Sequence, residues 1–321
     1  MKNLLLILLL LLTGEISAQQ TATIVVKTTP DNEIAYWPTG KDHLFFITLG
    51  TKAQADPQGQ FVHEFSVSRP TTIHVWAKGN NSFTLYLTPG SKDTIAVAKN
   101  TINFSGTNRV YNRCLKAVDD YQQYSDNLIY MQPHELEGVT SLEQYHQLAD
   151  ARMKQALDSV NASGLDKEFL AEQRAHIDYT HRSIFLHVAM YLVKNENFTE
   201  NWRKELAEII NQPVDSDYLR SYRGIGLFIN DLIGAQFIKL ENGKPEEIKD
   251  YCSFRFDRYR KFFKGDNLQY AQALLIYEDE FQTRNTPSIP QLYERYKAEF
   301  PNSPFLSVLE PGVNKNLRFQ N

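Results

Sequence analysis

This chain of 321 residues has few cysteines, few long apolar runs and no large excess of either charge. With only two cysteines, Cys114 and Cys252, the chain has no disulfide scaffold, no zinc ribbon and no C-x-x-C redox motif. The net charge of -4 gives no electrostatic reason to expect nucleic acid or anionic lipid as a partner. After the first residues, no apolar run approaches the roughly 20 residues that cross a bilayer, so the mature chain is not expected to span a membrane.

The N-terminal residues have the pattern of a signal peptide. Lys2 provides a short positive segment, and residues 4–12 are nine consecutive apolar residues. A small residue, Ala18, then stands at the expected cleavage point. We therefore expect residues 1–18 to be removed near Ala18 and the mature protein to be periplasmic or otherwise exported. An uncleaved N-terminal anchor is the alternative.

The hydrophobic pattern of the mature chain changes once. From residue 19 to residue 107, short β-branched and aromatic runs are separated by turn sequences such as Thr88-Pro89-Gly90. About half a dozen such runs at roughly 10-residue spacing predict an antiparallel β-sandwich. The expected strands are residues 24–26, 44–47, 61–67, 72–76, 83–87 and 95–97.

From residue 108 to residue 321 the apolar period is helical. Val110, Cys114, Ala117 and Tyr121, for example, share one helix face. The sequence predicts an all-α region, so the fold class is α+β, with a sandwich domain of residues 19–107 followed by a helical domain of residues 108–321. After the first helix, the expected helices are residues 141–160, 165–194, 199–210, 216–240, 245–264, 267–282 and 290–300, with a short one near residues 303–309.

Three histidines on one predicted helix are the first candidates for metal chemistry. The spacings between His176, His181 and His187 are five and six residues, whereas a helical zinc pair normally stands three or four residues apart. His176 and His187 share a face but lie roughly 16 Å apart along the axis. A hydrogen-bonded core histidine is the better interpretation of His181, so the sequence predicts no metal site.

Residues 251–264 interleave aromatic residues with arginine and lysine. Nucleic acid is not expected as the partner of an exported protein. Arginine side chains lying across core aromatic rings explain the pattern as well, and ligand or partner binding at this segment is the alternative. No nucleophile elbow, zincin motif or dinucleotide motif occurs, so the sequence predicts no catalytic or cofactor-binding residue.

Cys114 and Cys252 both lie on predicted helix faces with apolar neighbours, so we expect them to be structural. They could form a disulfide if their helices bring the two Cα atoms within about 7 Å. Neither is expected in the first turn of its helix, where the helix dipole would favour a thiolate.

Three segments together resemble one known family. Residues 86–95 (YLTPGSKDTI) resemble a hairpin of its small β-sandwich. Residues 102–108 (INFSGTN), followed by Asn112 and Leu115, resemble the entry into its first helix. Residues 293–309 (YERYKAEFPNSPFLSVL) resemble the end of its helical segment. This combination is similar to the N-terminal half of exported TlpA-like thiol–disulfide oxidoreductases of Gram-negative bacteria, in which a sandwich and a helical segment precede a thioredoxin domain.

In that family the catalytic C-x-x-C belongs to the thioredoxin domain, which would follow residue 309 after a short linker. This sequence ends at Asn321 without it, so the resemblance transfers no catalytic residue, and a truncated or split gene stays open. The resemblance implies an exported non-catalytic binding or assembly module, associated with thioredoxin-like envelope redox proteins, whose protein or small-molecule partner is unknown. The alternative is a thiol–disulfide redox role, through Cys114 and Cys252 or with a separately encoded thioredoxin domain.

Overall fold

The computed structural model describes residues 20–39, 44, 50–79, 81–98, 101–131, 134–281 and 286–319. Within these ranges the chain forms two compact units, one of residues 20–36 and 51–113 and the other mainly of residues 114–319, with residues 37–39 grouped with it. Within the described residues every strand ends by Gly106 and only helices follow. The change from strands to helices therefore falls where the hydrophobic period changes. The first unit extends a few residues further, into the first turns of the next helix.

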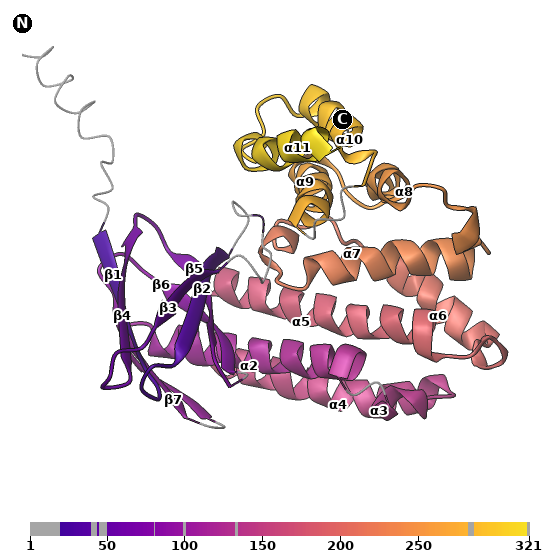
Figure 1. The fold of residues 1–321 in the computed structure, drawn as a ribbon. Helices are drawn as coiled ribbons and strands as arrows, with labels where there is room; N and C mark the ends of the chain where they lie inside the picture. Colours follow the sequence, from indigo (N-terminus) through magenta and orange to yellow (C-terminus); the bar gives the residue numbers. More distant parts are fainter. Residues whose placement is uncertain are drawn as a thin grey trace, which may run out of the picture. The chain divides into compact units, whose positions relative to one another are not determined.

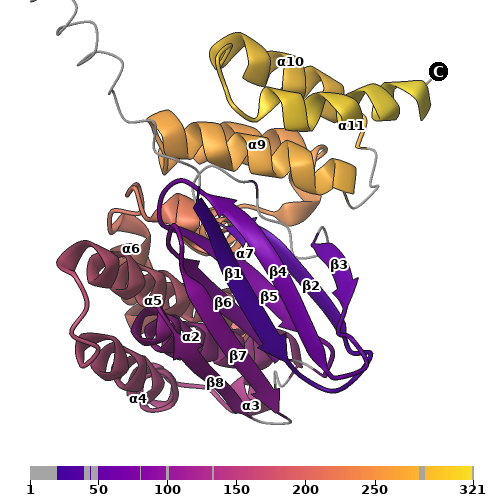
Figure 2. The same ribbon diagram turned by 90° about the vertical axis from the view of Figure 1, so that its left-hand side faces the viewer.

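The first unit is a sandwich of two four-stranded sheets, as far as the described residues show (Figures 1 and 2). One sheet has the order β4-β1-β7-β8 and the other β3-β2-β5-β6. The pairs β1–β4, β2–β3, β5–β6 and β7–β8 are antiparallel, and β1 pairs with β7 in parallel. The predicted α+β class with an N-terminal sandwich is confirmed. The strands are β1 Gln20–Lys27, β2 Glu33–Thr39, β3 Thr51–Gln54, β4 Gln60–Val67, β5 Thr71–Ala77, β6 Asn81–Leu87, β7 Lys92–Ala98 and β8 Thr101–Gly106.

The sandwich core is built from the alternating apolar positions of both sheets. In the β5–β6 pair, Val75 lies opposite Phe83 in the ladder, and both side chains are fully buried. Phe83 meets Phe104 of β8 edge to face, with ring centroids 6.1 Å apart. These contacts join one sheet to the other, as expected for strands with one apolar face.

Three strands have no clear strand pattern and were not predicted. The four residues of β3 are mostly polar and exposed, and β3 stands at the edge of its sheet. Pro38 near the end of β2 weakens the strand pattern there. β8 is also an edge strand, with a polar start. The strand predicted at residues 44–47 lies outside the described residues except for Leu44, which is in no strand.

A hydrogen-bonded corner, formed by Asp93 and Asn108, joins β7 to the residues that follow β8. Asp93 is only 2% exposed, and its carboxylate accepts two hydrogen bonds from Asn108. The backbone N–H donates to Oδ1 at 2.7 Å and the side-chain Nδ2 donates to Oδ2 at 2.9 Å. The carboxylate therefore fixes the direction in which the chain leaves the sheet.

Two further residues complete this corner. Gly106 has φ +110°, and a Cβ atom there would lie 2.2 Å from the carbonyl oxygen of Lys92, so only glycine fits. Asn112, in the first turn of α2 (Arg109–Asp126), accepts a hydrogen bond through Oδ1 from the backbone N–H of Tyr86 at 2.7 Å. Residues 86–95 and 102–108 with Asn112, which carry the family resemblance, thus bond to one another and support the fold.

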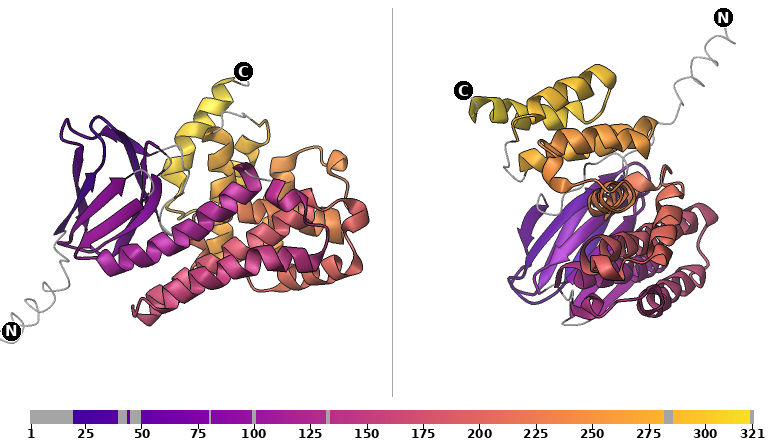
Figure 3. Two further views of the ribbon diagram at one scale, coloured as in Figure 1. Left: turned by 90° about the horizontal axis from the view of Figure 1, so that it is seen from below. Right: turned by 90° about the vertical axis from the view of Figure 1, so that its right-hand side faces the viewer.

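From residue 114 onward, the described residues of the second unit form helices and turns. α5 is in contact with both α4 and α7, and α9 with both α10 and α11 (Figures 1 and 3). Trp202 of α6 is fully buried, with its ring 5.9 Å from Tyr145 of α4 and 5.3 Å from Phe185 of α5. The α-helices after α2 are α3 His134–Glu137, α4 Leu142–Asn161, α5 Lys167–His187, α6 Glu200–Asn211, α7 Ile225–Gly234, α8 Tyr251–Arg258, α9 Gly265–Phe281, α10 Ile289–Glu299 and α11 Leu306–Phe319.

Several predicted helices are shorter or divided in the structure. The expected helix at 165–194 is α5, which ends in a π-helical turn, Val188–Leu192. The one at 216–240 is a 3-10 turn, then α7, then a π-helical turn, Ala235–Leu240. Conversely, α11 runs well beyond the short helix expected near 303–309, and α3 was not predicted. No helix in the described ranges is long and apolar enough to cross a membrane.

The prediction of one helix at residues 245–264 is wrong, and the difference changes the position of Cys252 in its helix. Pro245–Glu247 forms only a 3-10 turn, and α8 begins at Tyr251. The side chain of Asp250 caps α8 by accepting hydrogen bonds from the backbone N–H groups of Cys252 and Ser253, at 3.0 and 3.2 Å. Cys252 is therefore in the first turn of its helix, contrary to the prediction.

Candidate functional site

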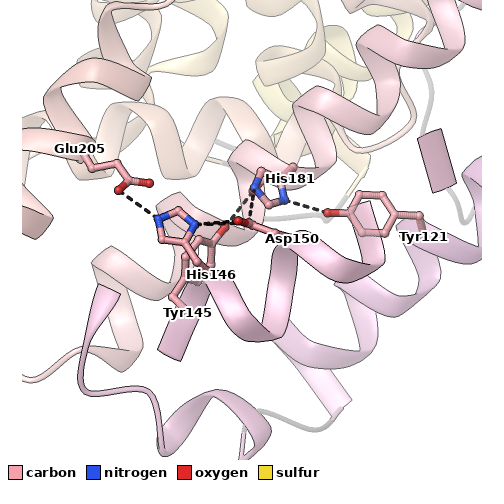
Figure 4. A network of polar contacts seen from close by, with 6 residues as sticks. All are labelled: Tyr121, Tyr145, His146, Asp150, His181 and Glu205. Atoms are coloured by element: carbon pink, nitrogen blue, oxygen red, sulfur yellow. Dashed lines mark hydrogen bonds and ion pairs between the residues drawn. The ribbon is translucent and has the colours of Figure 1, made fainter. Parts of the chain in front are cut away.

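A network of polar side chains links α2, α4, α5 and α6 of the helical unit (Figure 4). Asp150 lies between two imidazole rings, with Oδ2 3.1 Å from His146 Nδ1 and Oδ1 3.4 Å from His181 Nε2. His146 Nε2 faces Glu205 Oε2 at 3.2 Å. His181 Nδ1 faces the Tyr121 hydroxyl at 3.0 Å. Every ring nitrogen of the two histidines therefore has a partner.

Burial and the two carboxylates give these histidines opposite pKa shifts. Burial lowers the pKa of His181, and Asp150 offsets this only in part. Burial also lowers the pKa of His146, but its hydrogen bonds to Asp150 and Glu205 outweigh burial and raise the pKa above its usual value. On acidification His146 is thus protonated first and becomes a cation between two carboxylates, and His181 is protonated only at lower pH.

The network connects helices and leaves few groups for a ligand. Tyr121 is only 4% exposed, and burial raises the pKa of its phenol, which therefore stays protonated. Tyr145 is buried beside it, with its hydroxyl 3.4 Å from the carbonyl oxygen of His181. Across the residues that the structure describes, no group of three His, Cys, Asp or Glu side chains could hold a metal ion.

The three histidines of α5 have separate surroundings. His176 Nε2 is 3.1 Å from the Ser221 hydroxyl, and His181 belongs to the network above. His187 Nδ1 lies 3.5 Å from Oδ2 of Asp231, a buried acid on α7. The interpretation of His181 as a hydrogen-bonded histidine is confirmed. The His187–Asp231 pair could not be predicted from the sequence, because its members come from different helices.

Cys114 and Cys252 are both free, buried thiols, so the disulfide considered from the sequence is not formed. Burial raises the pKa of each thiol. Although Cys252 is in the first turn of α8, its Sγ lies 3.9 Å from a carboxylate oxygen of Asp279, which also raises the thiol pKa. Its Sγ is equally 3.9 Å from the Thr286 hydroxyl. Neither position favours the thiolate form.

The basic and aromatic residues of segment 251–264 pack against one another. The guanidinium of Arg258 lies 4.8 Å from the ring centroid of Phe237 and 4.7 Å from that of Phe254. Arg255 is 4% exposed and donates to the Tyr259 hydroxyl at 2.9 Å. The interpretation of this pattern as arginine packed on aromatic rings is confirmed.

Comparison of the chain with protein families, with curated proteins and with solved structures finds no match.

Proposed function

We propose that this protein is an exported, non-catalytic binding module of the cell envelope that works with thioredoxin-like redox proteins. The observation that carries the proposal is the corner formed by Asp93 and Asn108. These residues lie in two separate segments that resemble the TlpA-like N-terminal half, and they bond directly to each other. The resemblance therefore involves residues that act together at the entry to α2, and the signal-peptide pattern of residues 1–18 supports export.

The chemistry of the two thiols favours binding over catalysis. Thiol–disulfide exchange needs an accessible thiolate and a second thiol that can resolve the mixed disulfide. Cys114 and Cys252 are 3% and 8% exposed, and burial raises the pKa of both. Under this proposal the helical unit supplies a binding surface, and the redox chemistry belongs to the partner.

Two measurements test the proposal. Reduction of insulin by the purified mature protein with dithiothreitol should stay at background, and the Cys114→Ala, Cys252→Ala double variant should behave identically. A rate above background that the double variant loses would establish the redox alternative in its place. The intact mass of the exported protein should correspond to an N-terminus at or next to Gln19, and a retained Met1 would contradict export by cleavage.

Association is tested in the envelope itself. Cross-linking in intact cells, followed by mass spectrometry, should join the helical unit to a protein with a thioredoxin fold. Cross-links exclusively to proteins without that fold would overturn the redox association.

A further inference from the structure

His187 and Asp231 form a pair whose chemistry the proposed function does not use. Asp231 is 2% exposed, and burial raises its pKa, with His187 the group that opposes this shift. Asp231 Oδ2 and His187 Nδ1 face each other as a long pair, 3.5 Å apart, and neither atom has another partner within the described residues. Burying a carboxylate that is imperfectly paired is unfavourable, and such groups in proteins are often found at functional sites.

The second ring nitrogen of His187 distinguishes it from the histidines of the network. His146 and His181 use both nitrogens on neighbouring side chains. His187 turns Nδ1 toward the buried acid, and its Nε2 has no partner in the described part of the chain. A buried carboxylate on one nitrogen fixes the orientation of an imidazole and prepares the other nitrogen for a hydrogen bond.

Tyr191 places an exposed aromatic ring beside this imidazole. The two ring centroids are 4.7 Å apart, and Tyr191 is 63% exposed. Tyr191 lies in the π-helical turn Val188–Leu192, which contacts the π-helical turn Ala235–Leu240 after α7. Such turns are rare in proteins, and those that occur are often found at functional sites.

The charges around this site select the kind of ligand. Burial, then Asp231 and then Tyr251, raise the pKa of Tyr191, so its phenol is a neutral donor. Tyr251, the first residue of α8, is also about half exposed, and the Arg255 guanidinium lies 5.8 Å from its ring centroid. The Arg255 guanidinium disfavours a cationic ligand, and the Asp231 carboxylate disfavours an anionic one. An uncharged ligand avoids both penalties.

We propose that Tyr191, His187 and Asp231 form a binding site for a neutral saccharide. The C–H face of a sugar ring packs on the exposed face of Tyr191, and a sugar hydroxyl bonds to Nε2 of His187, which Asp231 holds in place. The Tyr191 hydroxyl, and that of Tyr251, supply further hydrogen bonds at the edge. This inference rests on the proposed binding function and names a ligand class for it.

Saturation-transfer NMR on the mature protein tests the site with three probes: maltotriose, cellotriose and tri-N-acetylchitotriose. At least one should receive saturation at its ring protons. Tyr191→Ala should weaken that binding by about tenfold or more, without lowering the melting temperature because the ring is largely exposed. His187→Gln should weaken it as well. Val308→Ala is the matched control, since it removes an exposed apolar side chain, 48% exposed, from α11.

Three results would overturn the inference. One is no saturation transfer to any of the three sugars, and another is wild-type binding by Tyr191→Ala. The third is binding of choline or inorganic phosphate that Tyr191→Ala abolishes, which would assign a charged ligand. None of these results bears on the proposed function, which is tested by export, insulin reduction and cross-linking.

Discussion

Replacing Asp93 with alanine should destabilise the sandwich more than any exposed substitution in it. The change removes both acceptors of Asn108, at 2.7 and 2.9 Å, and leaves two buried donors without partners. A hydrogen bond to a charged group contributes about 1.5–3 kcal/mol, so the two together predict a loss of about 3–6 kcal/mol. Asp93→Asn should lose less, because it keeps one acceptor for the backbone N–H of Asn108.

Hydrogen exchange followed by mass spectrometry measures this effect where it arises. The amides of β7 and β8 should exchange faster in Asp93→Ala by the factor that this free energy predicts, since the opening of these strands is what the corner opposes. Ser105→Ala is the control, because its exposed hydroxyl makes only a 3.4 Å hydrogen bond to the carbonyl oxygen of Thr94. Its effect should stay within about 0.5 kcal/mol.

Wild-type exchange rates in β7 and β8 of the Asp93→Ala variant would contradict this prediction. In that case the residues of the family resemblance do not hold the sandwich together, and the structural argument for the proposed function is lost. A double variant with Asn108→Ala sharpens the result. Its cost should be clearly less than the sum of the two single costs, because both single changes break the same side-chain bond.

Three other predictions concern separate elements. Gly106→Ala should lower the free energy of unfolding in urea by more than about 2 kcal/mol, since φ is +110° and the new Cβ meets a carbonyl oxygen. Gly138→Ala is the control and should leave this free energy unchanged, because no atom lies within 4 Å of the new Cβ. Ser141→Ala should cost about 1 kcal/mol, seen as a lower melting temperature, because it removes the capping box that Ser141 forms with the third residue of α4. His181 and His146 should affect stability oppositely with pH. The folded pKa of His181 is lowered, so its contribution is lost as pH falls below its usual value of 6.5; that of His146 is raised, so its contribution is complete below 6.5 and lost as pH rises through the folded pKa. Urea midpoints measured across this range should fall less steeply on acidification in His181→Gln than in the wild type, and more steeply in His146→Gln.

The predictable parts of the fold are those where local sequence and tertiary packing agree. β5 and β6 have an apolar face that becomes the core, and α4 begins at a serine whose side chain caps it. β2 and β3 could not be predicted because their residues do not alternate, and the partner strands supply the pairing. The π-helical turns after α5 and α7 contact each other across helices that are far apart in the sequence. The local sequence pattern therefore predicted ordinary α-helix at both turns.

The polar sites were harder to predict than the fold, although part of each could be recognised in the sequence. His146 and Asp150 stand four residues apart on one helix face, as do His187 and Tyr191, and such pairs are neighbours on any helix. What the sequence could not show is the third member. Asp231 reaches His187 from α7, and Glu205 reaches His146 from α6. Spacing along one helix therefore does not predict the partners of these histidines, because some of those partners are acids on other helices.

The position of Cys252 shows why a helix N-terminus alone does not make a thiol reactive. The dipole and the free N–H groups of the first turn would stabilise a thiolate, and Cys252 stands there, contrary to the sequence prediction. In α8, however, the Asp250 carboxylate already accepts from the N–H groups of Cys252 and Ser253. Asp279 adds a second negative group next to the sulfur, and burial raises the thiol pKa further. A thiolate would thus have to form beside two carboxylates. The N–H groups that stabilise the thiolate in oxidoreductases are bonded here to the Asp250 side chain, which stabilises α8 and does not activate the thiol.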